Sequence, residues 1–314
     1  MSKNWSASRL GTYRSCLLKY YYSYVNPYDP SISVNDSLQG KGLCFHETAE
    51  QMDSNKTKEE MEAILQSKIE EYHVDTELYP EDEALRRLLL FWPEFITPRE
   101  QAGYTVKKEE WTSGDIDGAH YVGALDLHLL GPIARKTEEQ KKAEEALSAE
   151  EKLSLPAPKQ HIIIYDYKTA KTASASSYKD QLTLYAYLLG KERNWTPEMT
   201  AENVDLYVFF PFSTQKKDND FDNMLSSVKP IKYTADDIRK VIKANISTVR
   251  EANSINWDTV DISNLGSSNF TCRFCPFLGA IEDPETGFKG CKCSYDEGYR
   301  QVRGLKFHLR ENKK

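Results

Sequence analysis

An apolar, β-branched run at residues 160–165 leads directly into two charged side chains, Asp166 and Lys168. The run predicts a short buried strand. Positions i and i+2 of a strand share a face, so the carboxylate and the amine lie on the same side. Burying an unpaired charge is expensive, which leaves a salt bridge at a strand end or a catalytic pair. A carboxylate that holds Mg²⁺ or Mn²⁺, beside a lysine that orients or deprotonates water, suits metal-assisted hydrolysis of a phosphodiester bond.

A second acid interrupts another apolar strand. Residues 104–111 and 121–129 alternate with a period of two and predict antiparallel strands joined by a turn around 114–118. Asp126 falls within the second of these strands, where a carboxylate needs a partner or a metal ion. Glu110, on the adjacent strand, is a weaker acid candidate.

The rest of the chain is expected to be mostly helical. Helices are predicted at 6–24 with Cys16 in the middle, 40–52, 57–74, 81–96, 178–189 with a cap at Gly190, and from 234 onward, with strands at 204–210 and around 226–233. His46 is a candidate metal ligand or phosphate contact, although a lone helical histidine also suits a structural role. Gln181 and Tyr185 are four residues apart and share a helix face, either as contacts to nucleic acid or as a polar helix edge. Tyr20 and Tyr22 either pack a helix or stack on bases.

Composition limits the class of protein. A chain of 314 residues with 39% hydrophobic content can bury a real core. Its net charge of −7 argues against a generally basic nucleic-acid-binding surface but allows a local acidic metal site. No apolar run has the length of a membrane span and the N-terminus lacks a signal-peptide core, so we expect no membrane partner and a cytoplasmic location, in the host cytoplasm if the protein is phage-encoded.

Four of the six cysteines cluster near the C-terminus, at Cys272, Cys275, Cys291 and Cys293. In a reducing compartment such a cluster indicates metal ligation rather than disulfides. The last fifteen residues, 300–314, carry six Lys or Arg against one Glu. They suit either a contact strip for the DNA backbone or a solubilising tail.

Four motifs taken in order resemble the RecB-type nuclease domain of the PD-(D/E)XK superfamily: Gly42 to His46, Gly123-Ala124-Leu125-Asp126, Tyr165-Asp166-Tyr167-Lys168-Thr169, and Gln181 to Tyr185. The resemblance spans about residues 40–190. It implies an α/β, restriction-endonuclease-like core in which helices flank a central mixed sheet. It also implies that His46, Asp126, Asp166 and the Tyr167 carbonyl bind the catalytic metal ions, that Lys168 serves the attacking water, and that Gln181 and Tyr185 help to hold DNA. Tyr167 stands where the superfamily name has its variable residue, and Asp166 fills the acid position before it.

The flanks resemble a subgroup that includes AddB-type recombination nucleases and CRISPR-associated adaptation nucleases. In that subgroup one cysteine before the core and three after it hold a [4Fe–4S] cluster. Cys16, Cys272 and Cys275 match this pattern, with either Cys291 or Cys293 as the last ligand. The alternative is a local zinc site made by the four C-terminal cysteines, with Cys16 spare. Cys44 is expected to be a buried apolar thiol.

These inferences predict one nuclease domain over residues 1–314. Its parts are an N-terminal helix at 1–39, a helical part at 40–100, a core at 101–255 with a charged insertion at 132–159, and a cysteine cluster with a basic tail at 256–314. The expected activity is a Mg²⁺- or Mn²⁺-dependent DNA exonuclease acting on ends or single strands in replication, recombination or repair, in a cell or a phage. The sequence contains no G-x-x-x-x-G-K-[ST] motif, so unwinding would come from a separate helicase or recombination protein. The alternatives are a non-catalytic DNA-binding or assembly subunit with a nuclease-like fold, or a zinc-stabilised scaffold.

Overall fold

The computed structural model describes residues 4–27, 36–74, 87–133, 157–169, 174–211 and 227–260, with short pieces at 138–139, 144, 147–148, 265, 281–282 and 289–290. The chain divides into two compact units. The first comprises residues 1–4 and 37–243, and the second comprises residues 5–36 and 244–314.

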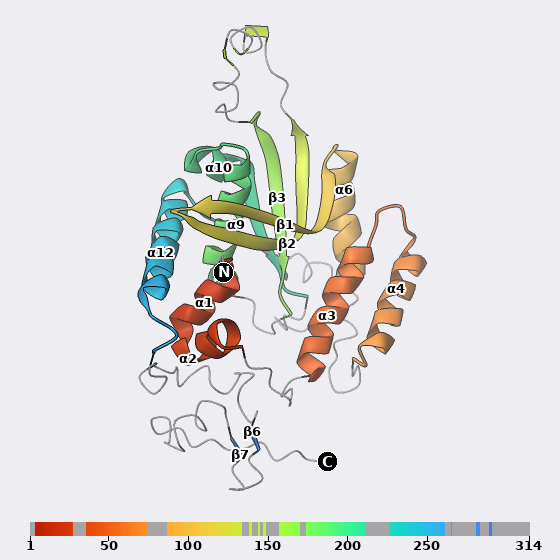
Figure 1. Ribbon diagram of the computed structural model, residues 1–314. Helices are drawn as coiled ribbons and strands as arrows, with labels where there is room; N and C mark the ends of the chain where they lie inside the picture. The colour runs from red at the N-terminus through yellow and green to blue at the C-terminus, as the bar shows by residue number, and fades with distance from the viewer. Residues whose placement is uncertain are drawn as a thin grey trace. The chain divides into compact units, whose positions relative to one another are not determined.

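The first unit is built on a five-stranded mixed sheet in the order β1-β2-β3-β4-β5 (Figure 1). The strands are β1 (Thr105–Ile116), β2 (Ala119–Ile133), β3 (Gln160–Tyr167), β4 (Val204–Phe209) and β5 (Val228–Ile231). Strands β3 and β4 are parallel, and the other neighbouring pairs are antiparallel. This arrangement confirms the predicted α/β class with a central mixed sheet.

The turn between β1 and β2 is tighter than predicted. It consists of Asp117 and Gly118, with φ of 52° and 76°, and positive φ at both central residues is the signature of a type I′ hairpin. The turn pairs Ile116 with Ala119 and thereby sets the register of the whole hairpin. The expected turn at 114–118 was therefore too wide, and β2 continues to Ile133, two residues into the expected insertion at 132–159.

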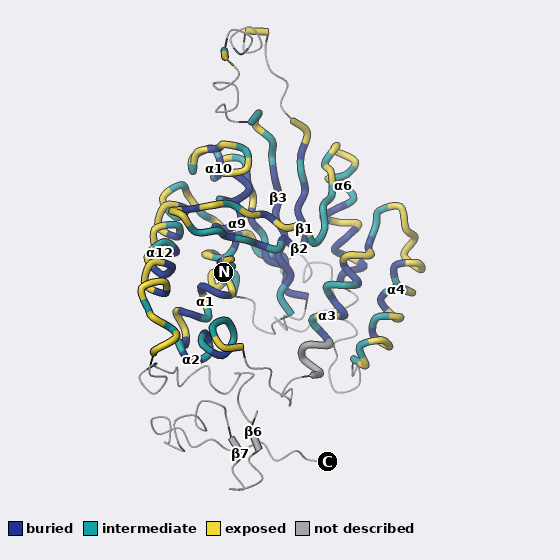
Figure 2. Tube along the Cα trace, in the orientation of Figure 1, coloured by how far each residue is buried: buried dark blue, intermediate teal, exposed yellow. Residues whose placement is uncertain are grey.

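One face of the sheet is covered by α3 (Asp36–Gln51), α4 (Lys58–Glu71) and a helical stretch at 87–101 that includes the π-helical turn η2 (Trp92–Ile96) and α6 (Thr97–Gln101). Their apolar side chains form one core with the inner residues of β2 to β5, and buried positions follow these elements in Figure 2. Pro98 was expected to stop this helix. It lies in the first turn of α6 instead, directly after the π-helical turn η2.

The opposite face is covered by α9 (Lys179–Glu192) and α10 (Pro197–Asn203), which follow the 3₁₀ turn η3 (Ala175–Tyr178) (Figure 1). They form the crossover that a parallel pair such as β3 and β4 requires. Gly190 was expected to cap α9 but lies inside it. A side chain there would collide with Thr200 of α10, so this glycine serves close helix packing rather than helix termination.

The second unit contains α1 (Ala7–Ser15), α2 (Leu17–Tyr20), the π-helical turn η1 (Tyr21–Val25) and the end of α12 (Ala235–Ser254). The guanidinium of Arg14 donates to Asn245 Oδ1 at 2.6 Å and to Thr248 Oγ1 at 2.9 Å. Tyr20 is fully buried and packs against Trp257, with ring centroids 5.4 Å apart. The packing role predicted for the N-terminal tyrosines is thus confirmed for Tyr20.

Cys16 does not lie in the middle of a helix as predicted. Its backbone is extended, with φ of −162° and ψ of 111°, and separates α1 from α2. Its Sγ accepts the backbone N–H of Lys19 at 3.4 Å and so caps α2. The described part of the C-terminal region also includes the short strands β6 (Ile281–Glu282) and β7 (Lys289–Gly290). Among the described helices, none combines the length and apolarity that crossing a bilayer requires.

Candidate active site

Asp126 and Asp166 are brought together by the antiparallel pairing of β2 with β3. Leu127 pairs with Tyr165, so the next residues outward, Asp126 and Asp166, stand opposite each other. Asp126 Oδ2 accepts the backbone N–H of Tyr167 at 2.6 Å. Asp166 is 3% exposed and the side chain of Asp126 is 12% exposed, so both carboxylates are largely removed from water.

This crowding disfavours the ionised form of both acids. Burial, reinforced by repulsion from Asp166, raises the pKa of Asp126 to about 7. Burial also raises the pKa of Asp166, although Lys168 opposes the effect. A divalent cation would stabilise the ionised form of both carboxylates, because it compensates the charge of both at once.

Lys168 follows β3 directly, and its backbone N–H donates to the carbonyl of Phe209 in β4 at 2.9 Å. Its Nζ lies 2.8 Å from Asp166 Oδ2, which confirms the prediction that the amine and the carboxylate lie on one side. Burial lowers the pKa of Lys168, but the ion pair with Asp166 outweighs it and the net shift is upward. The amine is therefore held protonated beside the two acids.

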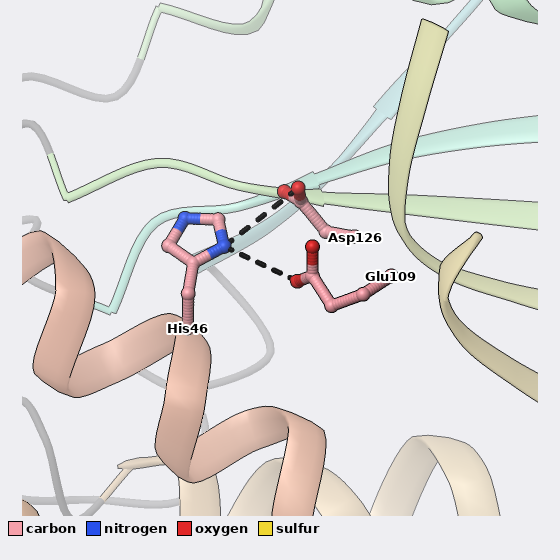
Figure 3. Close-up of side chains that lie close together, drawn as sticks. All are labelled: His46, Glu109 and Asp126. Atoms are coloured by element: carbon pink, nitrogen blue, oxygen red, sulfur yellow. Dashed lines mark ion pairs between the residues drawn. The ribbon is translucent and has the colours of Figure 1, made fainter. Parts of the chain in front are cut away.

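His46 of α3 and Glu109 of β1 complete the cluster on a third side (Figure 3). The His46 Nδ1 atom lies 3.6 Å from Glu109 Oε1 and 3.7 Å from Asp126 Oδ1. One ligand atom from each of these residues lies within 4.8 Å of the others. Burial lowers the pKa of His46, but both carboxylates raise it and their combined effect prevails. Carboxylate oxygens with one imidazole suit Mn²⁺ and, more weakly, Mg²⁺, so the donor set fits a divalent metal.

Sequence analysis missed Glu109 and favoured Glu110. Glu110 forms an ion pair with Lys107 at 2.9 Å, whereas Glu109 has a φ of 48° in the middle of β1. Such a conformation is costly for a residue with a side chain and is often associated with functional sites. The Asp117-Gly118 turn was the signal that could have identified Glu109, because the register it sets places Glu109 opposite Asp126.

Gln181 and Tyr185, on one face of α9, join the same cluster. The Gln181 Nε2 atom donates to Asp166 Oδ1 at 3.3 Å and to the Tyr185 hydroxyl at 3.1 Å. Tyr185 is 5% exposed, and its ring lies over Gly123. A Cβ at that glycine would be 2.5 Å from a ring carbon, so the glycine three residues before Asp126 leaves room for the tyrosine that positions Gln181.

A family model described as the PD-(D/E)XK nuclease superfamily matches residues 4–151 and 153–280. The chain belongs to the PD-(D/E)XK nuclease superfamily. No individual curated protein matches it. The superfamily comprises hydrolytic nucleases that use divalent metal ions, which confirms the sequence-based resemblance at this level.

The structure brings together every residue that the resemblance to PD-(D/E)XK nucleases marked in the core: His46, Asp126, Asp166, Tyr167, Lys168, Gln181 and Tyr185. Of the cysteines, Cys16 is buried in a cluster with Leu18, Tyr22 and Leu265. Cys44 is fully buried in the main core, as predicted. The other four, Cys272, Cys275, Cys291 and Cys293, lie outside the described residues.

Proposed function

We propose that this protein is a Mg²⁺- or Mn²⁺-dependent deoxyribonuclease that cleaves phosphodiester bonds with an activated water molecule and without a covalent intermediate. The supporting observation is that a buried carboxylate, Asp166, and a largely buried one, Asp126, meet beside an amine 2.8 Å from Asp166. A structural salt bridge needs only one acid. A second acid in the same dry site costs stability, and a cation-dependent function accounts for its presence.

The metal ion would be held by side-chain groups from four elements, α3, β1, β2 and β3, and by one backbone carbonyl. We assign as ligands His46, Glu109, Asp126, Asp166 and the Tyr167 carbonyl. A divalent ion at such a site supplies Lewis-acid stabilisation to the scissile phosphate and lowers the pKa of bound water. Glu109 extends the set expected from the sequence, and the 4.8 Å spacing of donor atoms from Glu109, His46 and Asp126 supports its inclusion.

Lys168 would orient the attacking water and stabilise, with its protonated amine, the negative charge that develops on the scissile phosphate. Its position 2.8 Å from Asp166 Oδ2 places the amine beside the proposed metal ligands, where such charge stabilisation is needed. Gln181 would orient Asp166 through its hydrogen bond and present its amide to the DNA strand, as the resemblance implies. Because Tyr185 is buried, its contribution to DNA binding would be to hold Gln181 in place.

We further propose an exonuclease that acts on DNA ends or single strands in replication, recombination or repair. The basis is the RecB-like order of the four core motifs. We also propose that a helicase or recombination protein supplies the single strands.

The test is digestion of end-labelled linear DNA, single-stranded and double-stranded, with Mg²⁺, Mn²⁺ or EDTA. We expect degradation with either metal and none with EDTA, and release of mononucleotides or short oligomers from one labelled end would establish exonuclease action. Digestion of a covalently closed single-stranded circle would show endonuclease action instead. Absence of cleavage with retained DNA binding would favour the non-catalytic assembly subunit.

For the cysteines we propose a [4Fe–4S] cluster held by Cys16, Cys272, Cys275 and either Cys291 or Cys293. The burial of Cys16 and the N–H donated to its sulfur suit a cluster thiolate, whose potential such hydrogen bonds adjust. Anaerobically purified protein should then contain iron and absorb broadly near ~400 nm, and Cys16→Ala should lose both. Colourless protein with zinc that survives Cys16→Ala would favour the C-terminal zinc site.

A further inference from the structure

The amine of Lys168 has a second neighbour besides Asp166. It lies over the aromatic ring of Tyr178, 5.1 Å from the ring centroid, and its side chain is 22% exposed. A cation at this distance from a ring face is attracted by the quadrupole of the ring, and the attraction grows as water is excluded. Lys168 is thus placed between a carboxylate and an aromatic face.

Tyr178 is itself fixed. It is the last residue of η3 and the N-cap of α9, so its backbone is held by the start of a long helix. Its ring is partly buried and packs against Phe210, directly after β4, with centroids 5.9 Å apart. Strand β4 is also the strand whose Phe209 carbonyl accepts the Lys168 N–H. The Tyr178 ring and the Lys168 backbone are therefore both held at the same end of β4.

The two neighbours of Lys168 respond differently to a bound metal. Asp166 is a proposed metal ligand, and a divalent cation on its carboxylate competes with the amine and repels it. The ring of Tyr178 carries no net charge and binds no Mg²⁺ or Mn²⁺, so its attraction for the amine persists. The ring can therefore hold the amine where the carboxylate releases it.

We infer that Tyr178 is a positioning residue that keeps the Lys168 amine beside the reacting phosphate when Asp166 is engaged by metal. The inference rests on the proposed nuclease function, and it assigns the role to the face of the ring rather than to the hydroxyl. Leucine at position 178, which is apolar but has no ring, should fail to position the amine, and phenylalanine should succeed.

The first test compares Tyr178→Phe with Tyr178→Leu in single-turnover cleavage of end-labelled DNA with Mn²⁺. We expect Phe to stay within about twofold of the natural protein and Leu to lose roughly 2- to 30-fold in kcat, the range that a cation–π contact allows. KM, and DNA affinity with Ca²⁺ in place of Mn²⁺, should not change. Tyr187→Leu, a partly buried tyrosine on the same helix, is the matched control and should cleave normally.

A graded replacement separates the ring face from mere packing. Phenylalanine bearing one, two or three fluorine atoms at position 178 keeps its shape while its quadrupole weakens. We expect kcat to fall stepwise with each fluorine. A flat series, or equal losses in Tyr178→Phe and Tyr178→Leu, would overturn the inference.

A spectroscopic test does not depend on cleavage. In protein labelled with ¹³C at the lysine ε-carbons, the Lys168 signal, assigned through Lys168→Arg, should be shifted upfield by the ring of Tyr178, with and without Ca²⁺. The shift should disappear in Tyr178→Leu and persist in Tyr178→Phe. If the natural protein cleaves no DNA, the nuclease proposal is refuted. If the Lys168 signal with Ca²⁺ bound does not depend on residue 178, the positioning role of Tyr178 is refuted.

Discussion

Replacing Asp126 with asparagine is expected to abolish metal-dependent cleavage and, at the same time, to stabilise the metal-free protein at pH 8. The buried carboxylate faces Asp166, and burial with this repulsion raises its pKa from 3.8 to about 7. Asparagine removes the charge but keeps an oxygen for the Tyr167 N–H. The Asp126 carboxylate would thus both destabilise the metal-free fold and bind the metal ion.

The sign of the pH dependence follows from the direction of the shift. The pKa of Asp126 is higher in the folded protein than in the unfolded chain, so between about pH 4 and 7 the folded state binds more protons. The free energy of unfolding therefore falls as the pH rises through this range. At about 1.4 kcal/mol per pKa unit, the variant should gain roughly 2–4 kcal/mol over the natural protein at pH 8 and almost nothing at pH 4.

The measurements are urea unfolding with EDTA at several pH values, thermal unfolding with added Mn²⁺, and cleavage of end-labelled DNA. Metal should stabilise the natural protein by mass action and leave the variant unchanged. Asp115→Asn is the matched control, because this acid lies on the same hairpin with 79% of its side chain exposed. Retained cleavage in Asp126→Asn, or equal stability of the two proteins at pH 8, would contradict the assignment.

Replacing Lys168 with methionine should reduce cleavage by roughly 10²- to 10³-fold, the usual cost of removing one group that stabilises charge in the transition state. Methionine keeps the apolar stem but lacks the amine 2.8 Å from Asp166. Mn²⁺ binding should be retained or tightened, because Asp166 no longer shares its oxygen. Lys168→Arg should restore activity only in part, since a guanidinium keeps the positive charge but is larger and planar.

Single-turnover cleavage rates and Mn²⁺ titrations by calorimetry separate these effects. Lys179→Met is the control, because Lys179 also forms an ion pair, 3.0 Å from Asp237, yet belongs to no proposed catalytic group. Full activity in Lys168→Arg would show that only the positive charge matters and that the compact shape of the amine does not. Loss of Mn²⁺ binding in Lys168→Met would show instead that the lysine shapes the metal site.

Much of the nuclease core could be predicted because its signals are local. The strand that ends in Asp166 and Lys168 is visible from β-branched residues and a period of two, and adjacency alone places the two charges on one face. Asp126 was identifiable because a carboxylate in an apolar strand demands a partner. These inferences need only neighbouring residues.

Three features depended on contacts that the sequence alone did not reveal. Glu109 lies opposite Asp126 in the register that the tight Asp117-Gly118 turn sets, and the wider turn expected at 114–118 did not give that register. Gly190 stays within α9 because Thr200 of another helix occupies the space beside it. The helix predicted at 6–24 is interrupted at Cys16, although cysteine is not a strong helix breaker, because the Cys16 sulfur caps the next helix.

The sequence by itself determined the order of motifs, the superfamily and the acid–amine pair, since each depends on residue types at short spacing. Only the tertiary structure decided which groups surround that pair: His46 and Glu109 beside Asp126, Gln181 on Asp166, and Tyr178 over Lys168. The physical reason is that these contacts join separate helices and strands. Their distances depend on register, helix packing and one strained residue, which are properties of the whole folded chain.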